Sequence, residues 1–288
     1  MVDALAVWSE FSCRDFVRDA EDFFRRCGHA DPWNAILKQG STDFDTKYTD
    51  NPDEKPTYKT DLYISKYMDM HIRQNRTVLE KYLDKTLRNR MHIVFVDFGC
   101  GPMTSGLVLA EILSKHDEDY KKKLTYLGID ASQNMVERAK WINDNEQHKI
   151  FAPDRFGIVQ GTTFDFSDSV VEETLGSTTQ VDLAVLCMSF VLAPPTNRVR
   201  KDEQPSWARD LAEKWHQWIS RLPNLHETEI VYLNPDLYDF HLTWKEFTKA
   251  LKKQGTDGAF SYESGEIEYV PVPGLKSDVA SALIIGRK

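Results

Sequence analysis

Residues 91–106, MHIVFVDFGCGPMTSG, constrain the fold of this 288-residue chain more than any other stretch. The mainly apolar, partly β-branched run at 93–98 predicts a buried strand of the kind found inside parallel sheets. Gly99 and Gly101 follow at once, and a helical run at 107–113 comes next. This order predicts a ligand-binding unit, because glycines let the backbone approach a ligand and a helix N-terminus offers unpaired N–H groups.

An acid, Asp97, stands two residues before the first glycine and discriminates between two classes of ligand. A dinucleotide-binding turn has the pattern G-x-G-x-x-G, with an acid about 20 residues further on. Here Thr104 stands at the third glycine, and the next strand-end acid, Asp130, comes well past that distance. The acid-x-G-x-G pattern instead resembles the first motif of the class I S-adenosylmethionine (SAM) methyltransferases, with Met103 in place of a frequent third glycine. A glycine turn of another α/β protein is the alternative at this point.

The second predicted strand, 124–130, ends on Asp130 and leads into a helix that Ser132 can cap. The methyltransferase resemblance implies that the Asp130 carboxylate accepts hydrogen bonds from the two ribose hydroxyls of SAM and that Ala131 packs on the adenine. A carboxylate suits this role because each of its oxygens can accept one of the two hydrogen bonds. A simple helix-start acid is the alternative for Asp130. The cofactor-binding residues around these two motifs are Asp97, Gly99, Gly101, Thr104, Ser105, Asp130, Ala131 and Asn134.

Two further segments of the sequence point to a particular group within the methyltransferases. YISKYM at 63–68 and DASQNMVERAKW at 130–141 are similar to segments of the nicotinamide and phenylethanolamine N-methyltransferases, which is a weaker likeness than the first. In that group, tyrosines from the first of these segments close over the bound cofactor and substrate. The resemblance therefore implies that Tyr63 and Tyr67 form a lid on the cofactor. Core tyrosines of a capping helix are the alternative.

The ends of the third and fourth predicted strands supply further candidates. Methyltransferases usually place an acid after the third strand for the adenine amine. This chain has Thr162 and Thr163 there, so a hydroxyl or a backbone group would make that contact. Cys187 and Met188, at the end of the fourth strand, are candidates for cofactor contacts, and packing is the alternative for both. The chain lacks the sequence N-P-P-Y, a signature of amino methylation of bases and glutamine.

The fifth predicted strand, 229–233, is followed by three candidate general bases, Asp236, Tyr238 and His241. Methyl transfer from SAM is an in-line displacement of a sulfonium leaving group. The enzyme therefore supplies mainly positioning, and it needs a base only if the nucleophile must lose a proton. In the amine methyltransferases an acid in this neighbourhood contacts the amine, which makes Asp236 the first choice. A turn formed after Pro235 is the alternative role of Asp236.

Together the segments predict an α/β fold. We expect a Rossmann-like, doubly wound sheet of seven strands, mostly parallel, with an antiparallel C-terminal strand and a helical N-terminal cap. Residues 1–90 are expected to form this cap, with helices at 3–27 and 61–73 and a flexible loop at about 31–60 that acts as a lid. Residues 91–288 are expected to form the methyltransferase core. The predicted strands are 93–98, 124–130, 156–164 with its loop, 181–192, 229–233, 260–270 and 279–285.

Composition excludes several other classes. With 41% hydrophobic and 28% charged residues, the chain has the balance of a soluble globular protein. No apolar stretch approaches the roughly 20 residues that a membrane helix needs, and the N-terminus does not resemble a signal peptide. The four cysteines, Cys13, Cys27, Cys100 and Cys187, show no metal-ligand spacing, so we expect free thiols, no metal and a cytoplasmic location. A net charge of −9 disfavours a nucleic-acid partner, although a local basic patch at 198–201 is compatible with one.

These observations lead to one hypothesis of function and two alternatives. We expect a cytoplasmic enzyme that transfers the methyl group of SAM to a small molecule, an amine or an N-heterocycle. The first alternative is a methyltransferase of RNA or protein. The second is an inactive methyltransferase-fold subunit that binds without turnover. The sequence does not determine the acceptor, the methylated atom or the oligomeric state.

Overall fold

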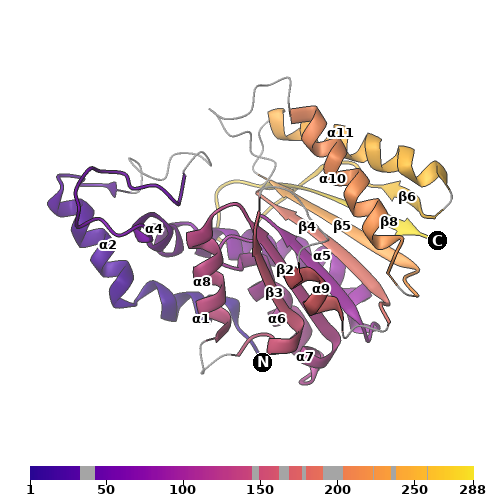
Figure 1. The fold of residues 1–288 in the computed structure, drawn as a ribbon, viewed down its shortest axis with the longest axis horizontal. Coiled ribbons are helices and arrows are strands. Elements are labelled where there is room, and N and C mark those ends of the chain that lie inside the picture. Colours follow the sequence, from indigo (N-terminus) through magenta and orange to yellow (C-terminus); the bar gives the residue numbers. More distant parts are fainter. Residues whose placement is uncertain are drawn as a thin grey trace.

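The computed structural model shows one mixed sheet with helices on both faces (Figure 1). Within the described residues the strands are hydrogen-bonded in the order β3-β2-β1-β4-β5-β8-β6, and β7 also pairs with β8. The strands are β1 (Ile93–Phe98), β2 (Leu124–Asp130), β3 (Phe156–Gln160), β4 (Leu183–Ser189), β5 (Glu227–Asn234), β6 (Ser261–Ser264), β7 (Glu268–Val270) and β8 (Val279–Arg287). The structure describes residues 1–32, 43–144, 149–161, 169–176, 180–190, 204–222, 224–234, 238–257 and 259–288.

The pairing is parallel from β3 to β5 and antiparallel between β5 and β8. The predicted doubly wound α/β sheet with an antiparallel C-terminal strand is therefore confirmed. The strand predicted at 260–270 is two strands, which raises the count from seven to eight in the described part of the chain. Between Ser264 and Glu268 there is one residue more than between their partners Ile284 and Ser281. This excess is that of a β-bulge, and Gly265 stands where the first of the two strands ends.

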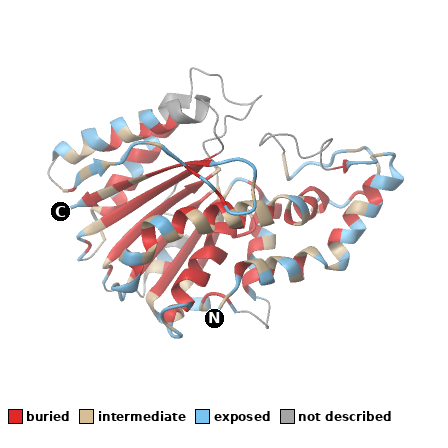
Figure 2. Ribbon diagram, turned by 180° about the vertical axis from the view of Figure 1, so that it is seen from behind, coloured by how far each residue is buried: buried red, intermediate tan, exposed pale blue. Residues whose placement is uncertain are grey.

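Helices cover both faces of the sheet and close two separate cores. α5, α6 and α8 pack on one face, and α9, α10 and α11 pack on the other. Figure 2 shows the strands buried along most of their length. No helix among the described residues is long and apolar enough to cross a membrane. The bounds are α5 (Met68–Arg88), α6 (Thr104–Ser114), α7 (Tyr120–Lys123), α8 (Gln133–Asp144), α9 (Ser169–Gly176), α10 (Gln204–Ile219), α11 (Tyr238–Gln254), η1 (Pro153–Arg155) and η2 (Gly255–Asp257).

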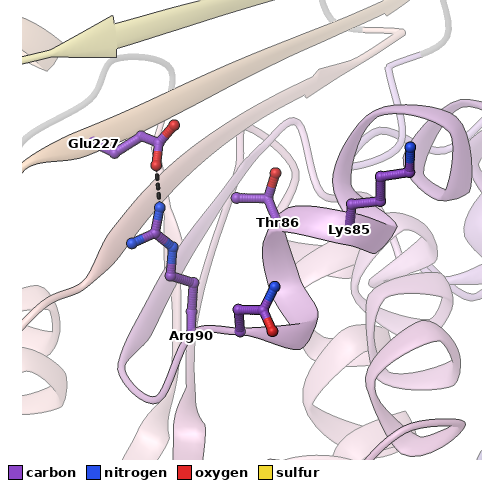
Figure 3. A pocket seen from close by; sticks show the side chains of 5 residues that line it. Lys85, Thr86, Arg90 and Glu227 are labelled. Atoms are coloured by element: carbon purple, nitrogen blue, oxygen red, sulfur yellow. Dashed lines mark hydrogen bonds and ion pairs between the residues drawn. The ribbon is translucent and has the colours of Figure 1, made fainter.

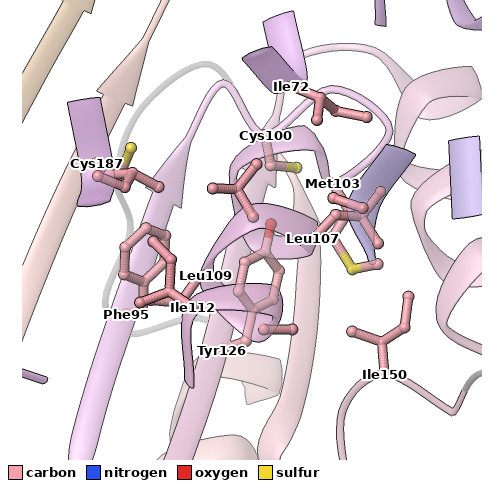
Figure 4. Close-up of a cluster of buried hydrophobic side chains, with 14 of the residues drawn as sticks. Ile72, Phe95, Cys100, Met103, Leu107, Leu109, Ile112, Tyr126, Ile150 and Cys187 are labelled. Carbon is pink, nitrogen blue, oxygen red and sulfur yellow. The ribbon is translucent and has the colours of Figure 1, made fainter. Parts of the chain in front are cut away.

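The first core contains α6, the helix that follows the glycine turn (Figure 4). Every residue of α6 is buried. Gly106 is needed within it, because a Cβ atom there would lie 2.6 Å from Cε2 of Tyr126 and 2.8 Å from Cγ of Met103. Met103 itself has a φ of 66°, a left-handed conformation that favours glycine. Its side chain is fully buried among apolar neighbours, and this packing opposes the backbone strain.

Three N-terminal helices lie beside α5, α6 and α8, namely α1 (Ala4–Ser12), α2 (Asp15–Arg26) and α4 (Tyr58–Lys66). The prediction of a single helix at 3–27 is wrong, because Arg14 takes an extended conformation between α1 and α2. The helix predicted at 61–73 is likewise divided at Tyr67, where α4 ends and α5 begins. α5 packs on the sheet itself. The division of the chain into a cap and a core at residue 90 stays a prediction.

An ion pair docks the N-terminal helices on α8. Arg138 of α8 donates two hydrogen bonds to Asp61 of α4, from Nε to Oδ1 at 2.7 Å and from Nη2 to Oδ2 at 3.0 Å. Its guanidinium also lies 4.2 Å from the centre of the Phe16 ring. Asp61 has no exposed surface, and this burial raises the pKa of its carboxyl although Arg138 opposes the rise. A carboxylate buried in this way depends on its cationic partner.

Replacing Arg138 by methionine leaves the Asp61 carboxylate buried without that partner. We expect the free energy of unfolding to fall by about 3–5 kcal/mol. The double variant Arg138→Met, Asp61→Asn contains neither charge of this pair and is expected to recover part of the loss. Arg18→Ala removes an exposed ion-pair partner and serves as a control that should change stability little. Urea unfolding measures all three, and equal stabilities of the single and double variants would contradict the argument.

Candidate functional site

The carboxyl ends of β1 and β2 meet at the glycine turn. Gly99 and Gly101 have φ angles of 73° and 52°, which glycine adopts most readily. The N–H of Gly99 donates to the carbonyl of Ile129 at 2.7 Å, and the N–H of Gly101 donates to Oδ2 of Asp130 at 2.8 Å. The turn after β1 is therefore tied to the end of β2, and the two motifs singled out in the sequence lie side by side.

Asp97 lies at the end of β1 with no exposed surface. Its Oδ2 accepts a hydrogen bond from the Tyr126 hydroxyl at 2.8 Å, whereas its Oδ1 has no hydrogen-bond partner among the described residues. Burial raises the pKa of this carboxyl to about 7, although the Tyr126 hydroxyl acts in the opposite direction. A buried acid with an unpaired oxygen is costly unless a ligand satisfies it. Asp97 therefore points to a bound group that carries a hydrogen-bond donor or a positive charge.

Asp130 is only half-buried and stands at the rim of the same turn. Its Oδ1 accepts a hydrogen bond from the Ser132 N–H at 2.9 Å, and its Oδ2 accepts the one from Gly101. Burial raises the pKa of the carboxyl, and these two N–H groups lower it. Each carboxylate oxygen has two acceptor positions, so both oxygens can accept a further hydrogen bond from a ligand. Ala131, the next residue, is exposed.

Two tyrosines, Tyr63 and Tyr67, lie at the junction of α4 and α5. Burial raises the pKa of Tyr63, and the carboxylates of Asp130 and Asp97 raise it further. Tyr67 stacks on Tyr63, with ring centroids 6.1 Å apart. The structure thus brings the two predicted lid tyrosines together. Their contact with a cofactor stays a prediction.

His71 is a residue of this site that the sequence analysis missed. Its Nδ1 is hydrogen-bonded to the Tyr63 hydroxyl, and its ring stacks on Phe190 with centroids 4.0 Å apart. Burial lowers the pKa of the imidazole to about 3, so the ring is neutral at pH 7. Spacing was the available signal, because Tyr63, Tyr67 and His71 recur every four residues and a helix places such residues on one face. An imidazole with a pKa this low is a weak proton acceptor near pH 7, so His71 contributes ring packing and a hydrogen bond to Tyr63.

His71 contacts Phe190 beside the switch point of the sheet, which lies between β1 and β4, and Tyr63 contacts His71. The helices that follow these two strands, α6 and α10, pack on opposite faces. Phe190 follows β4 directly with a φ of 62°. Beside it, the hydroxyl of Ser189 is buried and has no hydrogen-bond partner in the described part of the chain. In open α/β sheets, ligands bind outside the carboxyl ends of the strands at such a point.

The side chains of some of the remaining predicted site residues are described in the structure, and those of others are not. Thr104 and Ser105 form the buried first turn of α6. Cys187 pairs in register with Asp97, and Met188 lies on the opposite face, with both side chains fully buried, so their cofactor contacts stay predictions. Within the described ranges, no group of His, Cys, Asp and Glu side chains could hold a metal ion. Outside the described side chains lie Thr162, Thr163, Asp236, Tyr238 and His241, of which the last two are described only as part of α11.

Asn134, another predicted cofactor contact, joins α8 to the N-terminal segment 43–57. Its side-chain amide donates hydrogen bonds to the carbonyls of Phe44 at 2.8 Å and Pro56 at 3.1 Å. Both hydrogens of the amide are therefore used within the protein, and a cofactor contact of Asn134 stays a prediction. The segment 43–57 is the described part of the loop expected at 31–60, and its action as a lid stays a prediction as well.

A hollow of about 430 Å³ lies at the opposite, amino edge of the sheet (Figure 3). Side chains from the end of α5 and the start of β5 line it, with Arg90 in an ion pair with Glu227. These opposite charges compensate each other, and the hollow is separate from the glycine turn at the carboxyl edge. The lining residues are Lys85, Thr86, Asn89, Arg90 and Glu227.

No family model and no curated protein sequence matches the chain. Similar solved structures include a SAM-dependent methyltransferase from Aquifex aeolicus, at 12% identity over 74% of this chain and 92% of that one, with a TM-score of 0.42. A cyclopropane-fatty-acyl-phospholipid synthase-like protein from Lactobacillus casei has 12% identity, coverage of 77% and 92%, and a TM-score of 0.43. Magnesium protoporphyrin IX methyltransferase from Synechocystis, solved with bound SAM, has 14% identity, coverage of 94% and 98%, and a TM-score of 0.40. Identities and TM-scores this low do not carry a functional assignment.

Asp97→Asn tests the buried acid through the pH dependence of stability. The pKa of Asp97 rises from 3.8 to about 7 on folding, so its contribution to stability is full below about pH 4 and is lost as the pH rises through 7. The asparagine amide resembles the protonated acid and does not titrate. We therefore expect the variant to gain about 2–3 kcal/mol relative to the wild type between pH 5 and pH 8.

Urea unfolding at the two pH values measures this gain. Asp154→Asn, at an exposed acid of η1, is the matched control and should show no comparable change with pH. A difference between Asp97→Asn and the wild type that stays constant from pH 5 to pH 8 would contradict the prediction.

Proposed function

We propose that the chain is a SAM-dependent methyltransferase. The observation that carries this proposal is the pair of strand-end acids, Asp97 and Asp130, joined through one glycine turn. SAM offers a ribose diol, an ammonium group and a sulfonium, whereas a dinucleotide offers a pyrophosphate anion. Two carboxylates beside the turn attract the first ligand and repel the second.

The residues of the site fit this cofactor. Asp130 keeps acceptor positions for the two ribose hydroxyls, and the unpaired Oδ1 of Asp97 suits the positively charged methionine part. Tyr63 and Tyr67 then cover the site from the N-terminal side and exclude water. When bound, SAM supplies a methyl group that its sulfonium activates. The chain itself contributes binding, orientation and a dry environment, which is most of what an in-line displacement needs.

The acceptor that we propose is a small molecule, an amine or an N-heterocycle. The rings of Tyr63, His71 and Phe190 lie at the carboxyl ends of β1 and β4, where an acceptor would approach the methyl group. A site bordered by closely packed rings suits a small acceptor. The net charge of −9 does not favour a broad phosphate-binding surface. RNA or protein methylation and an inactive binding subunit remain the alternatives to test.

A proton acceptor is needed only if the nucleophile carries a proton that it must lose. Asp236, Tyr238 and His241 remain the candidates from the sequence, with Asp236 first. His71 is not added to them, because burial lowers the pKa of its imidazole to about 3 and its Nδ1 is already hydrogen-bonded to Tyr63.

Calorimetric titration with SAM, S-adenosylhomocysteine (SAH) and NAD tests the cofactor. We expect the wild-type protein to bind SAM and SAH but not NAD. Asp130→Ala should weaken SAM binding about tenfold or more, because a charge-assisted hydrogen bond contributes about 1.5–3 kcal/mol. Asp154→Ala removes an exposed acid of η1 and should bind SAM as the wild type does. Binding of NAD alone, or of none of the three, would lead us to withdraw the proposal.

Incubation of the purified protein and methyl-labelled SAM with a cell extract separates the acceptor classes. We expect label in the small-molecule fraction, and its loss with Asp130→Ala, because weaker cofactor binding lowers turnover. Label in the macromolecular fraction that nuclease or protease removes would instead favour RNA or protein methylation. Tight SAM binding with label in neither fraction would favour the inactive subunit.

A further inference from the structure

Residues 43–57, called here the N-terminal strap, lead into α4 and lie against the amino end of α8. Two buried charged side chains, Lys59 and Glu54, stabilise the conformation of the strap. The ammonium of Lys59 donates hydrogen bonds to the carbonyl of Asp43 at 2.8 Å and to the hydroxyl of Thr46 at 3.2 Å. The carboxylate of Glu54 accepts hydrogen bonds from two backbone N–H groups of the strap at 2.6 and 2.7 Å. The strap is thus a segment with a defined conformation and its own internal hydrogen bonds.

The strap presents Asp45 to the first turn of α8. The carboxylate of Asp45 accepts hydrogen bonds from the Ser132 hydroxyl at 2.8 Å and from the N–H groups of Gln133 and Asn134, each at 3.1 Å. An acid on the unpaired N–H groups of a helix N-terminus is a capping interaction. Here the capping residue lies 87 to 89 positions before its partners in the sequence.

Ser132 is the N-cap of α8, and its hydroxyl oxygen accepts a hydrogen bond from the N–H of Met135 at 3.2 Å. Asp45 holds this N-cap residue in place, because it accepts hydrogen bonds from the Ser132 hydroxyl and from the next two N–H groups, while the Ser132 N–H donates to Asp130. Among the described residues, the Asp130 carboxylate accepts hydrogen bonds from the N–H groups of Gly101 and Ser132. It therefore stays directed at the glycine turn, with acceptor positions left for a ligand.

We infer that Asp45 is a positioning residue for the ribose of the cofactor, acting through Asp130. This inference rests on the proposed SAM site. The neighbouring Phe44 meets the Tyr63 ring edge-on, with centroids 5.7 Å apart. The strap therefore contacts both sides of the site, the helix start beside the ribose acid and the ring predicted to cover the cofactor.

Calorimetric affinities for SAH, 2′-deoxy-SAH and 3′-deoxy-SAH test the role of Asp45. In the wild type, removing either ribose hydroxyl should weaken binding about tenfold, because a charge-assisted hydrogen bond to Asp130 is lost. In Asp45→Ala, SAH itself should bind about tenfold more weakly, and the penalty for a missing hydroxyl should shrink below about threefold. If Asp45 had only a structural role, its loss would lower the affinity for all three ligands by the same factor. That result would overturn the inference.

Two variants serve as matched controls. Asp45→Asn should restore most of the hydroxyl penalty, because asparagine also caps helices well. Asp53→Ala changes an exposed acid of the same strap and should leave all three affinities unchanged. Hydrogen exchange without ligand reports on the cap itself. The amides of Gln133 and Asn134 should exchange faster in Asp45→Ala than in Asp53→Ala, and equal rates would overturn the inference.

The failure of the inference and the failure of the proposed function are distinguishable. If the wild-type protein binds no SAH, the SAM proposal fails, and the role of Asp45 in holding a ribose fails with it. If SAH binds and the hydroxyl penalty is the same in the wild type and in Asp45→Ala, the SAM proposal stands and only the role of Asp45 is overturned.

Discussion

A hydrogen bond of 2.8 Å from the N–H of Gly101 to the carboxylate of Asp130 holds the ends of β1 and β2 together. The two residues are 29 positions apart and meet because their strands are neighbours in a parallel sheet. The left-handed conformation of Gly101, which costs glycine little, accompanies the bond to its N–H. This bond lies next to the buried Asp97, the glycine turn and the start of α6, and their positions are set relative to it.

Burial then decides the charge state of the groups around that turn. Removal from water penalises ionised groups, so the pKa of Asp97 rises to about 7 and the pKa of His71 falls to about 3. An acid that is costly to ionise when alone gains most when a positively charged ligand arrives. The same burial keeps the imidazole of His71 neutral beside the Tyr63 hydroxyl. Burial alone thus accounts for a carboxyl that is partly protonated and an imidazole that is neutral at pH 7.

Local sequence signals predicted the centre of the fold well. The bounds of β1 and β2 coincide with the predicted 93–98 and 124–130, because each is an apolar run that ends at an acid and a turn. The breaks at Arg14 and Tyr67 were missed, since the helical spacing of apolar residues continues through both positions. Only the packing of the N-terminal helices against α5 and α8 requires the chain to turn there. The bulge that divides 260–270 was missed because it exists only relative to the partner strand β8.

The sequence by itself determined which residues stand at the strand ends, Asp97 and Asp130, and that a glycine turn lies between strand and helix. These are properties of short segments, in which burial, turn formation and helix capping depend on near neighbours. The tertiary structure alone decided that His71 lies at the switch point and that Asp45 caps α8. Such contacts join residues far apart in the chain and depend on how the N-terminal helices and the strap pack against the sheet. The spacing of Tyr63, Tyr67 and His71 indicates only that the three share a helix face.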